Sequence, residues 1–208
     1  TAEGLADSDM GIEEIPENLD ARRNLCGPLD GTSPPHPLSS RNASSIPTIQ
    51  TATATKRPEL LVGLHFFNPV PAMKLVEVVR SLQTSDAAVS AVTAFVESLG
   101  KQPIQTKDRP GFVVNRLLVP YLLDAIRACE SGLASREDID TGMTLGCGYP
   151  MGPLTLLDFV GLDTIFSIAN ILYDEFKEPR YAPPVLLKQM VQAGYFGKKN
   201  GKGFFDYP

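Results

Sequence analysis

Two apolar segments separated by a proline-rich loop constrain the fold of this chain most strongly. The first, residues 60–64, is a short apolar run typical of a buried strand, and the second, residues 74–79, predicts another strand. The residues between them, 68–71, contain two prolines and predict a loop. If the strands pair antiparallel about the second proline, His65 and Glu77 lie opposite each other, close enough for a carboxylate to orient an imidazole.

This pair of residues has two interpretations. A carboxylate beside an imidazole favours its charged form and holds its tautomer, which suits a general acid or base. A histidine in an apolar strand is also often a satisfied core residue, and a buried histidine–glutamate pair can be purely structural. The residues alone leave both interpretations open.

Composition narrows the class of protein. The chain has 208 residues, 43% hydrophobic and 21% charged, as in ordinary globular proteins, and its net charge of −5 argues against general nucleic-acid binding. No apolar run approaches transmembrane length, and no signal-peptide pattern opens the chain. Its three cysteines lack metal-ligand spacing, so we expect reduced thiols and no metal site.

The first 57 residues carry few periodic signals. A helix is expected over residues 16–25, and residues 27–45 are rich in proline, serine and glycine, which is typical of turns and extended chain. Short strands and long loops are therefore predicted for this region.

From Pro58 onward the pattern is regular. Thr84 or Ser85 caps a helix whose apolar positions, valines 89, 92 and 96 and Leu99, follow helical spacing and which Gly100 ends. Residues 103–105 predict a short strand. Only helices follow. They are expected over residues 115–131, with Leu117 and Leu122 among the inward positions and Pro120 as a kink, then after a capping box at Ser135 and Asp138, and over residues 154–160, 163–176 and 184–192. This order predicts an α/β part followed by an all-α part.

Several long motifs resemble those of one enzyme family. The segment H-F-F-N-P-V-P-A-M-K-L-V-E from His65 is similar to the catalytic segment of the L-3-hydroxyacyl-CoA dehydrogenases, including the 3-hydroxybutyryl-CoA dehydrogenases. The resemblance covers essentially Pro58 to Tyr207 and continues weakly upstream. Its further motifs are P-G-F-V-V-N-R-L-L from Pro110, E-D-I-D-T-G-M from Glu137, G-Y-P-M-G-P from Gly148, G-L-D-T from Gly161, G-K-K-N-G-K-G-F-F-D-Y from Gly197, and weaker matches from Ile12 and Asn42.

The resemblance implies a fold and an activity. The fold is a partial Rossmann-type NAD-binding domain over residues 1–108 and a helical domain over residues 109–208 that serves the substrate and dimerisation. The activity is reversible NAD-dependent oxidation of the 3-hydroxyl of an L-3-hydroxyacyl-CoA to the 3-ketoacyl-CoA. We expect a homodimer or a partner chain, and the mitochondrial matrix or, alternatively, a bacterial cytoplasm.

It also implies roles for the histidine–glutamate pair and three polar residues. His65 is the acid/base and Glu77 orients it, while Asn68 matches a position beside the nicotinamide. Ser44 matches a serine near the cofactor and substrate. Asn115 matches an asparagine that hydrogen-bonds the substrate oxygen. Each of the last three has a plainer interpretation, as a turn former, part of a serine-rich loop and a helix cap.

Three charged residues complete the implied cofactor contacts. Glu17 and Arg22 align with a glutamate and a lysine at the cofactor's edge, with arginine in place of lysine. Lys199 matches a lysine that reaches toward the cofactor, although a solvated basic turn explains it nearly as well.

The family pattern is incomplete upstream. The motif G-x-G-x-x-G, whose glycines bring the backbone close to the pyrophosphate, occurs nowhere in the sequence. The acidic residue that would bind the adenosine ribose and the segment that would bind the coenzyme A moiety are missing too. The alignment predicts a chain that begins about halfway through the Rossmann domain. Three explanations stay open: a truncated enzyme, a second chain that supplies the missing half, or an inactive family remnant that serves as a structural or interaction subunit.

Overall fold

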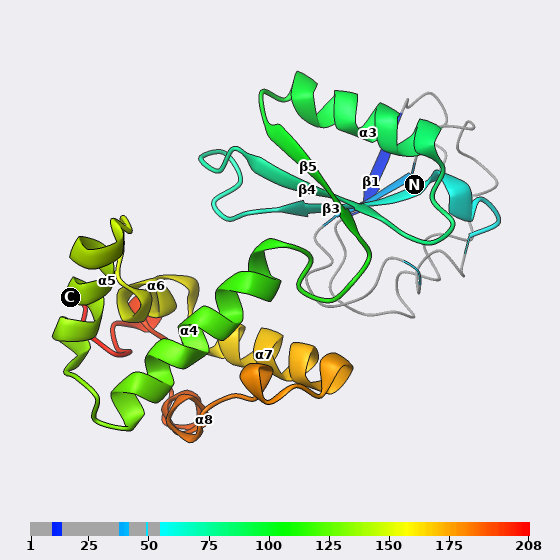
Figure 1. Ribbon diagram of the computed structural model, residues 1–208. Helices are drawn as coiled ribbons and strands as arrows, with labels where there is room; N and C mark the ends of the chain where they lie inside the picture. Colours follow the sequence, from blue (N-terminus) through cyan, green and yellow to red (C-terminus); the bar gives the residue numbers. More distant parts are fainter. Residues whose placement is uncertain (1–9, 14–37, 42–48, 50–54) are drawn as a thin grey trace. The chain divides into compact units, whose positions relative to one another are not determined.

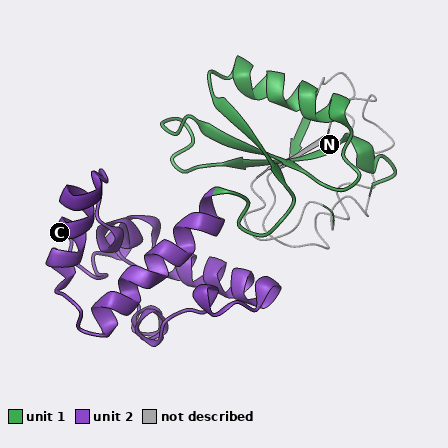
Figure 2. Cartoon of the chain, in the orientation of Figure 1, with its two compact units in different colours: residues 1–113 green, residues 114–208 purple. Residues whose placement is uncertain are grey.

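The computed structural model describes residues 10–13, 38–41, 49 and 55–208. The chain divides into two compact units, residues 1–113 and 114–208 (Figure 2). The helix expected over residues 16–25 and the site candidates Glu17, Arg22 and Ser44 lie outside the described residues. So does the segment rich in proline, serine and glycine at 27–45, apart from residues 38–41, which form a strand.

The first unit is built on a five-stranded sheet (Figure 1). The strands follow the order β1-β2-β3-β4-β5, with β1 and β2 parallel to β3, β4 antiparallel to β3, and β5 parallel to β4. β5 is an edge strand, which tolerates Pro103 because a proline there removes no donor that the sheet needs. The bounds are Gly11–Glu13, Leu38–Arg41, Leu61–Phe66, Leu75–Arg80 and Gln102–Lys107, and a 3-10 turn, η2 (Pro58–Leu60), precedes β3.

The predicted hairpin is formed by β3 and β4. Residues 67–74, here named the hairpin loop, join the two strands, and the antiparallel register places His65 opposite Glu77. Their predicted opposition is therefore confirmed. All six residues of β3 are buried, as in a strand that is covered on both faces.

Helix α3 (Asp86–Ser98) connects β4 to β5 and covers one face of the sheet (Figure 1). The Ser85 hydroxyl accepts a hydrogen bond from the Ala88 N–H, which confirms Ser85 as its N-cap. Valines 89, 92 and 96 are buried as predicted, and full burial of such a side chain contributes about 1.5–3 kcal/mol, whereas Leu99, at the C-cap, is 48% exposed. They pack against alternate residues of the hairpin, namely Val62, Leu64, Phe66, Val76 and Val78.

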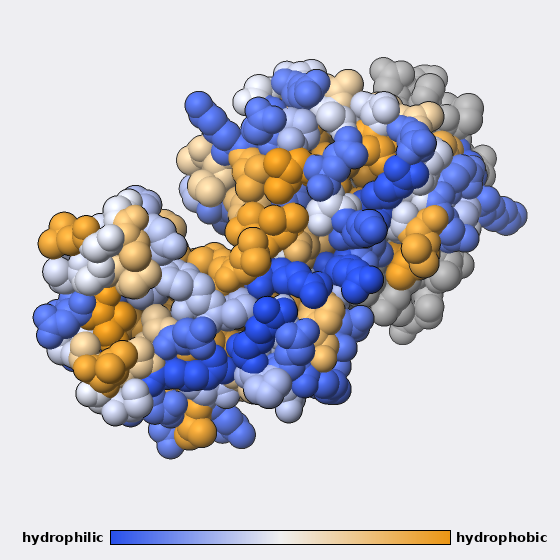
Figure 3. Space-filling view, viewed as in Figure 1, coloured by the Kyte–Doolittle hydropathy of each residue, from blue (hydrophilic) through white to orange (hydrophobic). Residues whose placement is uncertain are grey.

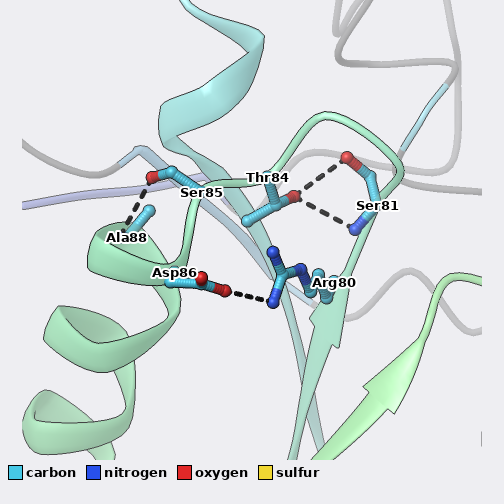
Figure 4. A network of polar contacts seen from close by, with 6 residues as sticks. All are labelled: Arg80, Ser81, Thr84, Ser85, Asp86 and Ala88. Carbon is cyan, nitrogen blue, oxygen red and sulfur yellow. Dashed lines mark hydrogen bonds and ion pairs between the residues drawn. The ribbon is translucent and has the colours of Figure 1, made fainter.

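A polar network fixes the turn between β4 and α3 (Figure 4). The Thr84 hydroxyl accepts from the Ser81 N–H at 3.0 Å, lies 2.9 Å from the Ser81 hydroxyl, and donates to the Leu61 carbonyl at 2.7 Å. Arg80 and Asp86 form an exposed ion pair beside it. Because Thr84 is buried and bonded across to β3, it fixes where α3 begins relative to the hairpin.

The second unit contains helices, short turns and two isolated β-bridges near the end of the chain. One apolar core joins all of its larger helices except α5, whose residue Ile139 packs against that core from the side. At the start of α5 the Ser135 hydroxyl accepts from the Asp138 N–H at 3.0 Å, which confirms Ser135 as the N-cap, and donates to the Asp138 carboxylate at 2.7 Å. The elements are α4 (Val114–Glu130), α5 (Arg136–Cys147), α6 (Pro153–Val160), α7 (Leu162–Phe176), η3 (Pro179–Tyr181), α8 (Val185–Gln192) and η4 (Lys198–Asn200).

Helix α4 packs mostly through the face expected, with Leu117 as the exception. Leu117 is 72% exposed, so its predicted inward position is wrong, whereas Leu122 is buried as predicted. The buried positions of α4 include Val119, Leu123 and Ile126. Leucine or valine occurs on several faces of this helix, so apolar spacing alone does not select the face that packs.

No helix in the described part of the chain is long and apolar enough to cross a membrane by itself. Among the described helices, α6 and α7 reach the required length and composition when taken together, and they bend by 95° at their junction. Much of this pair belongs to the apolar core of the second unit, including Leu157, Leu162 and Ile165.

Candidate active site

The alternation of side chains along the hairpin sets the position of the candidate site. Residues at even positions, such as Leu64 and Val78, pack in the cluster beneath α3. Successive side chains in a strand point to opposite faces, so His65 and Glu77 lie on the face that α3 does not cover.

His65 and Glu77 form a short, buried contact on that face. The Nδ1 atom of His65 lies 2.5 Å from Oε2 of Glu77, and the two residues are 5% and 0% exposed. With Nδ1 directed at the carboxylate, the ring's second nitrogen, Nε2, is the one that remains for a reacting group. A carboxylate held in this way fixes the tautomer and the orientation of the imidazole.

The segment that follows β5 adds a second contact to the carboxylate. The backbone N–H of Val113 donates to Oε1 of Glu77 at 3.0 Å. Glu77 is thus held from two sides, by the imidazole of His65 on one oxygen and a backbone amide on the other. This contact was not predicted, and no local signal indicates it because the two residues are 36 positions apart.

Aromatic rings enclose the imidazole. The ring centroids of Phe67 and Phe112 lie 4.5 and 5.5 Å from that of His65. Phe112 is 6% exposed and has a φ of 43°, a left-handed conformation that is unfavourable for a residue with a Cβ atom. Such outliers persist where the surrounding structure imposes them, often at functional sites. The Pro110-Gly111 pair ahead of Phe112 is the turn signal in the sequence.

The other predicted site residues are placed as follows. Asn68 is exposed in the hairpin loop, three residues beyond His65, and its peptide bond to Pro69 is cis. Asn115 lies in the first turn of α4 and is partly buried, so it is not the N-cap residue itself. Among the predicted residues that the structure describes, it brings together His65 and Glu77 directly.

Lys199 has a partner within the helical unit. Its Nζ atom lies 2.5 and 2.6 Å from the two carboxylate oxygens of Asp163, in the first turn of α7. Both side chains are partly exposed, at 47% and 38%. An exposed pair of this kind contributes about 0–1 kcal/mol to stability, which leaves the lysine available for exchange with another anion.

No metal centre accompanies the pair. Across the described residues, no group of three or more histidine, cysteine, aspartate or glutamate side chains is arranged to hold a metal ion. The arrangement of His65 and Glu77 by itself is suited to proton transfer: the carboxylate orients the imidazole through Nδ1, and aromatic rings lie beside the imidazole.

Sequence profiles of one family match both parts of the chain. The NAD binding domain of 3-hydroxyacyl-CoA dehydrogenase matches residues 1–109, and the C-terminal domain of the same enzyme matches residues 111–207.

Individual relatives agree with these profiles. A 3-hydroxybutyryl-CoA dehydrogenase of Mycobacterium tuberculosis is 49% identical over 205 residues, which are 98% of this chain and 72% of that protein. The human mitochondrial hydroxyacyl-coenzyme A dehydrogenase is 47% identical over 201 residues, 96% of this chain and 64% of its own length. The crystal structure of (S)-3-hydroxybutyryl-CoA dehydrogenase from Ralstonia eutropha superposes with a TM-score of 0.95 at 44% identity, covering 100% of this chain and 74% of that one. The chain therefore belongs to the 3-hydroxyacyl-CoA dehydrogenase family.

Proposed function

We propose that this protein catalyses the reversible NAD-dependent oxidation of the 3-hydroxyl of an L-3-hydroxyacyl-CoA to the 3-ketoacyl-CoA. The observation that carries the proposal is the buried contact of 2.5 Å between His65 Nδ1 and Glu77 Oε2 in a chain of this family. An inactive remnant has no need to keep an imidazole and a carboxylate buried, because desolvation of polar and charged groups costs free energy.

The chain's own residues move one proton. In the oxidation, His65 Nε2 accepts the proton of the substrate hydroxyl as the C3–H bond breaks, and the electron pair of the O–H bond becomes part of the new carbonyl. Glu77 stabilises the resulting imidazolium through Nδ1. The chemistry that bound NAD supplies is acceptance of the C3 hydride. In the reduction, His65 Nε2 returns the proton to the carbonyl oxygen.

The sheet of the first unit fits a dinucleotide. Strands β1, β2 and β3 are parallel, so their carboxyl ends share one edge, which is where ligands bind in open α/β sheets. His65 is the second-last residue of β3, and Asn68 lies in the loop just after the carboxyl end of that strand. NAD would therefore be held along this edge by residues that follow the three strands.

Six residues are proposed as binding contacts. Asn68, Glu17, Arg22 and Lys199 are assigned to the cofactor. Ser44 and Asn115 are assigned to the acyl-CoA substrate. Asn68 is exposed just after β3, the strand that carries His65, which supports its assignment to the cofactor. The exposed ion pair of Lys199 with Asp163 is compatible with the assignment of Lys199 to the cofactor.

The functions of the two domains are also proposed. Residues 1–108 are assigned to NAD and residues 109–208 to the substrate and to dimerisation, in line with the family profiles. Figure 3 shows apolar residues on the surface of the helical unit, where Leu117, Leu145 and Val185 are 72%, 82% and 63% exposed. A second copy of the chain is the proposed cover, and native mass measurement tests it.

The proposed compartment is the mitochondrial matrix, with a bacterial cytoplasm as the alternative. The human relative named mitochondrial and the mycobacterial relative are almost equally similar, at 47% and 49% identity. Fractionation of cells of the source organism distinguishes the two.

The function is tested by NADH-dependent reduction of acetoacetyl-CoA with the purified protein. Wild-type protein is expected to turn over, and His65→Ala is expected to lower kcat by about 10²–10⁴-fold, the usual contribution of a general acid or base. Saturable quenching or enhancement of NADH fluorescence should be equal in both proteins. Absence of turnover and of NADH binding in the wild type would contradict the proposed function, and unchanged kcat in His65→Ala would contradict the role of His65.

A further inference from the structure

Lys101 links three elements of the first unit. Its backbone N–H donates to the Val96 carbonyl at 3.3 Å, while the Gly100 N–H donates to the Glu97 carbonyl at 2.9 Å. With Gly100 at a φ of 72°, these bonds form a Schellman motif that ends α3. Lys101 is therefore placed rigidly between the end of α3 and the start of β5.

The side chain of Lys101 reaches the hairpin loop. Its ammonium group donates to the Val70 carbonyl at 2.6 Å and to the Met73 carbonyl at 2.8 Å. A charged donor forms stronger hydrogen bonds than a neutral one, and the two acceptors lie on opposite sides of the loop's turn. The Lys101 ammonium group therefore closes the hairpin loop and holds it to the segment that leads into β5.

The hairpin loop has few other anchors. The side chain of Val70 is partly buried against the cluster beneath α3, and the Pro69 carbonyl accepts from the N–H groups of Ala72 and Met73 at 3.0 and 3.1 Å. At the last residue of the loop, the Lys74 carbonyl accepts from the Gln102 N–H at 2.7 Å. The remaining side chains of its turn are exposed: Asn68, Pro69, Pro71, Ala72, Met73 and Lys74. Because so little apolar surface is buried here, the position of the loop depends strongly on Lys101.

We propose that Lys101 is a positioning residue of the dehydrogenase, which holds the hairpin loop so that Asn68 is presented to the nicotinamide cofactor. The inference rests on the proposed function and names a residue outside the set of direct contacts. Lys101 acts on the cofactor through Asn68: the ammonium holds the carbonyl of Val70, two residues beyond it. It does not touch His65 or Glu77, so proton transfer itself stays intact.

Steady-state kinetics with three variants test this role. Lys101→Met keeps the methylene chain and removes the donors, and it is expected to lower kcat/KM for NADH by about tenfold, with KM for acetoacetyl-CoA changed by less than about twofold. Lys107→Met, at the exposed end of β5 that is farther from Lys101, is the matched control and should equal the wild type. Asn68→Ala with Lys101→Met should be no slower than Asn68→Ala alone, because both changes remove the same contact.

Hydrogen exchange supplies a readout that does not depend on activity. The amides of Ala72 and Met73 should exchange faster in Lys101→Met and not in Lys107→Met. Unchanged exchange, unchanged kcat/KM for NADH, or effects of Asn68→Ala and Lys101→Met that multiply would each overturn the proposal. These results differ from failure of the proposed function, which would show as a wild-type protein without turnover.

Discussion

The backbone N–H of Val113 donates to Oε1 of Glu77 while Oε2 of the same carboxylate contacts His65. Val113 is the last residue of the first unit, and α4 begins at the next position. The orientation of the acid/base pair therefore depends on the segment that leads into the helical unit. A change in the path of that segment would alter the hydrogen bonding of Glu77 without any change in the hairpin.

The first prediction concerns the charge of Glu77. Glu77→Gln keeps the side chain's shape but places an amide where two donors, the Val113 N–H and the His65 ring, need acceptors. We expect kcat to fall by about 100-fold, since the imidazolium loses its partner. The kcat of acetoacetyl-CoA reduction is measured for each variant, and Glu97→Gln on the exposed side of α3 is the control. Equal loss in both variants would show that Glu77 has no special role.

The second prediction tests the backbone of Phe112. Both Phe112→Ala and Phe112→Gly lose the buried ring, which costs about 3–5 kcal/mol. Because the φ of 43° penalises any Cβ atom by about 1–2 kcal/mol, the glycine variant should be the more stable of the two. At an ordinary φ the order would be reversed, since glycine loses more backbone entropy on folding. Urea unfolding measures the free energy of unfolding of both variants, and a more stable alanine variant would contradict the left-handed conformation of residue 112.

Much of the hairpin follows from the sequence alone. Two apolar runs about a proline-rich loop define the register, and the register places His65 against Glu77. Ser85 and Ser135 are predictable as N-caps because a hydroxyl that satisfies a free N–H is a local requirement. These features depend on neighbours a few residues away or on strand alternation.

Other parts of the site depend on long-range packing and could not be predicted. The contact of Val113 with Glu77, the ring of Phe112 over His65 and the reach of Lys101 to the hairpin loop all join distant segments. The wrong inward assignment of Leu117 has a similar cause, because only the packed core shows which side of an apolar helix is covered.

The third prediction contrasts two glycines of the helical unit. A Cβ atom on Gly203 would lie 1.9 Å from Oδ1 of the buried Asp158 and 2.7 Å from the Cα atom of Gly197. Gly203→Ala should therefore destabilise the protein by about 1–3 kcal/mol or more. A Cβ atom on Gly142, inside α5, meets nothing within 4 Å, so Gly142→Ala should stabilise it by about 0.5–1 kcal/mol. Thermal unfolding measures both, and equal shifts would contradict the tight contact at Gly203.

The last prediction concerns pH and the C-terminal segment. The Tyr207 hydroxyl donates to Oδ2 of Asp158 at 3.1 Å, and the same carboxylate accepts from the N–H groups of Phe204 and Phe205, each at 2.8 Å. Burial, the charge of Asp158 and this hydrogen bond raise the pKa of Tyr207 from 10.0 to about 12. Burial also raises the pKa of Asp158, against the effect of its three donors.

A phenol with a raised pKa stays neutral in the folded protein after it has ionised in the unfolded chain. Its contribution to the free energy of unfolding is complete below pH 10 and is lost as pH rises from 10 toward about 12. Tyr207→Phe should lower the Tm at pH 8, because Asp158 loses a donor, and should show a smaller fall in Tm between pH 10 and 11 than the wild type. Tyr195→Phe, in the same unit, is the control. Parallel curves for wild type and Tyr207→Phe over this range would contradict the coupling of Tyr207 to Asp158.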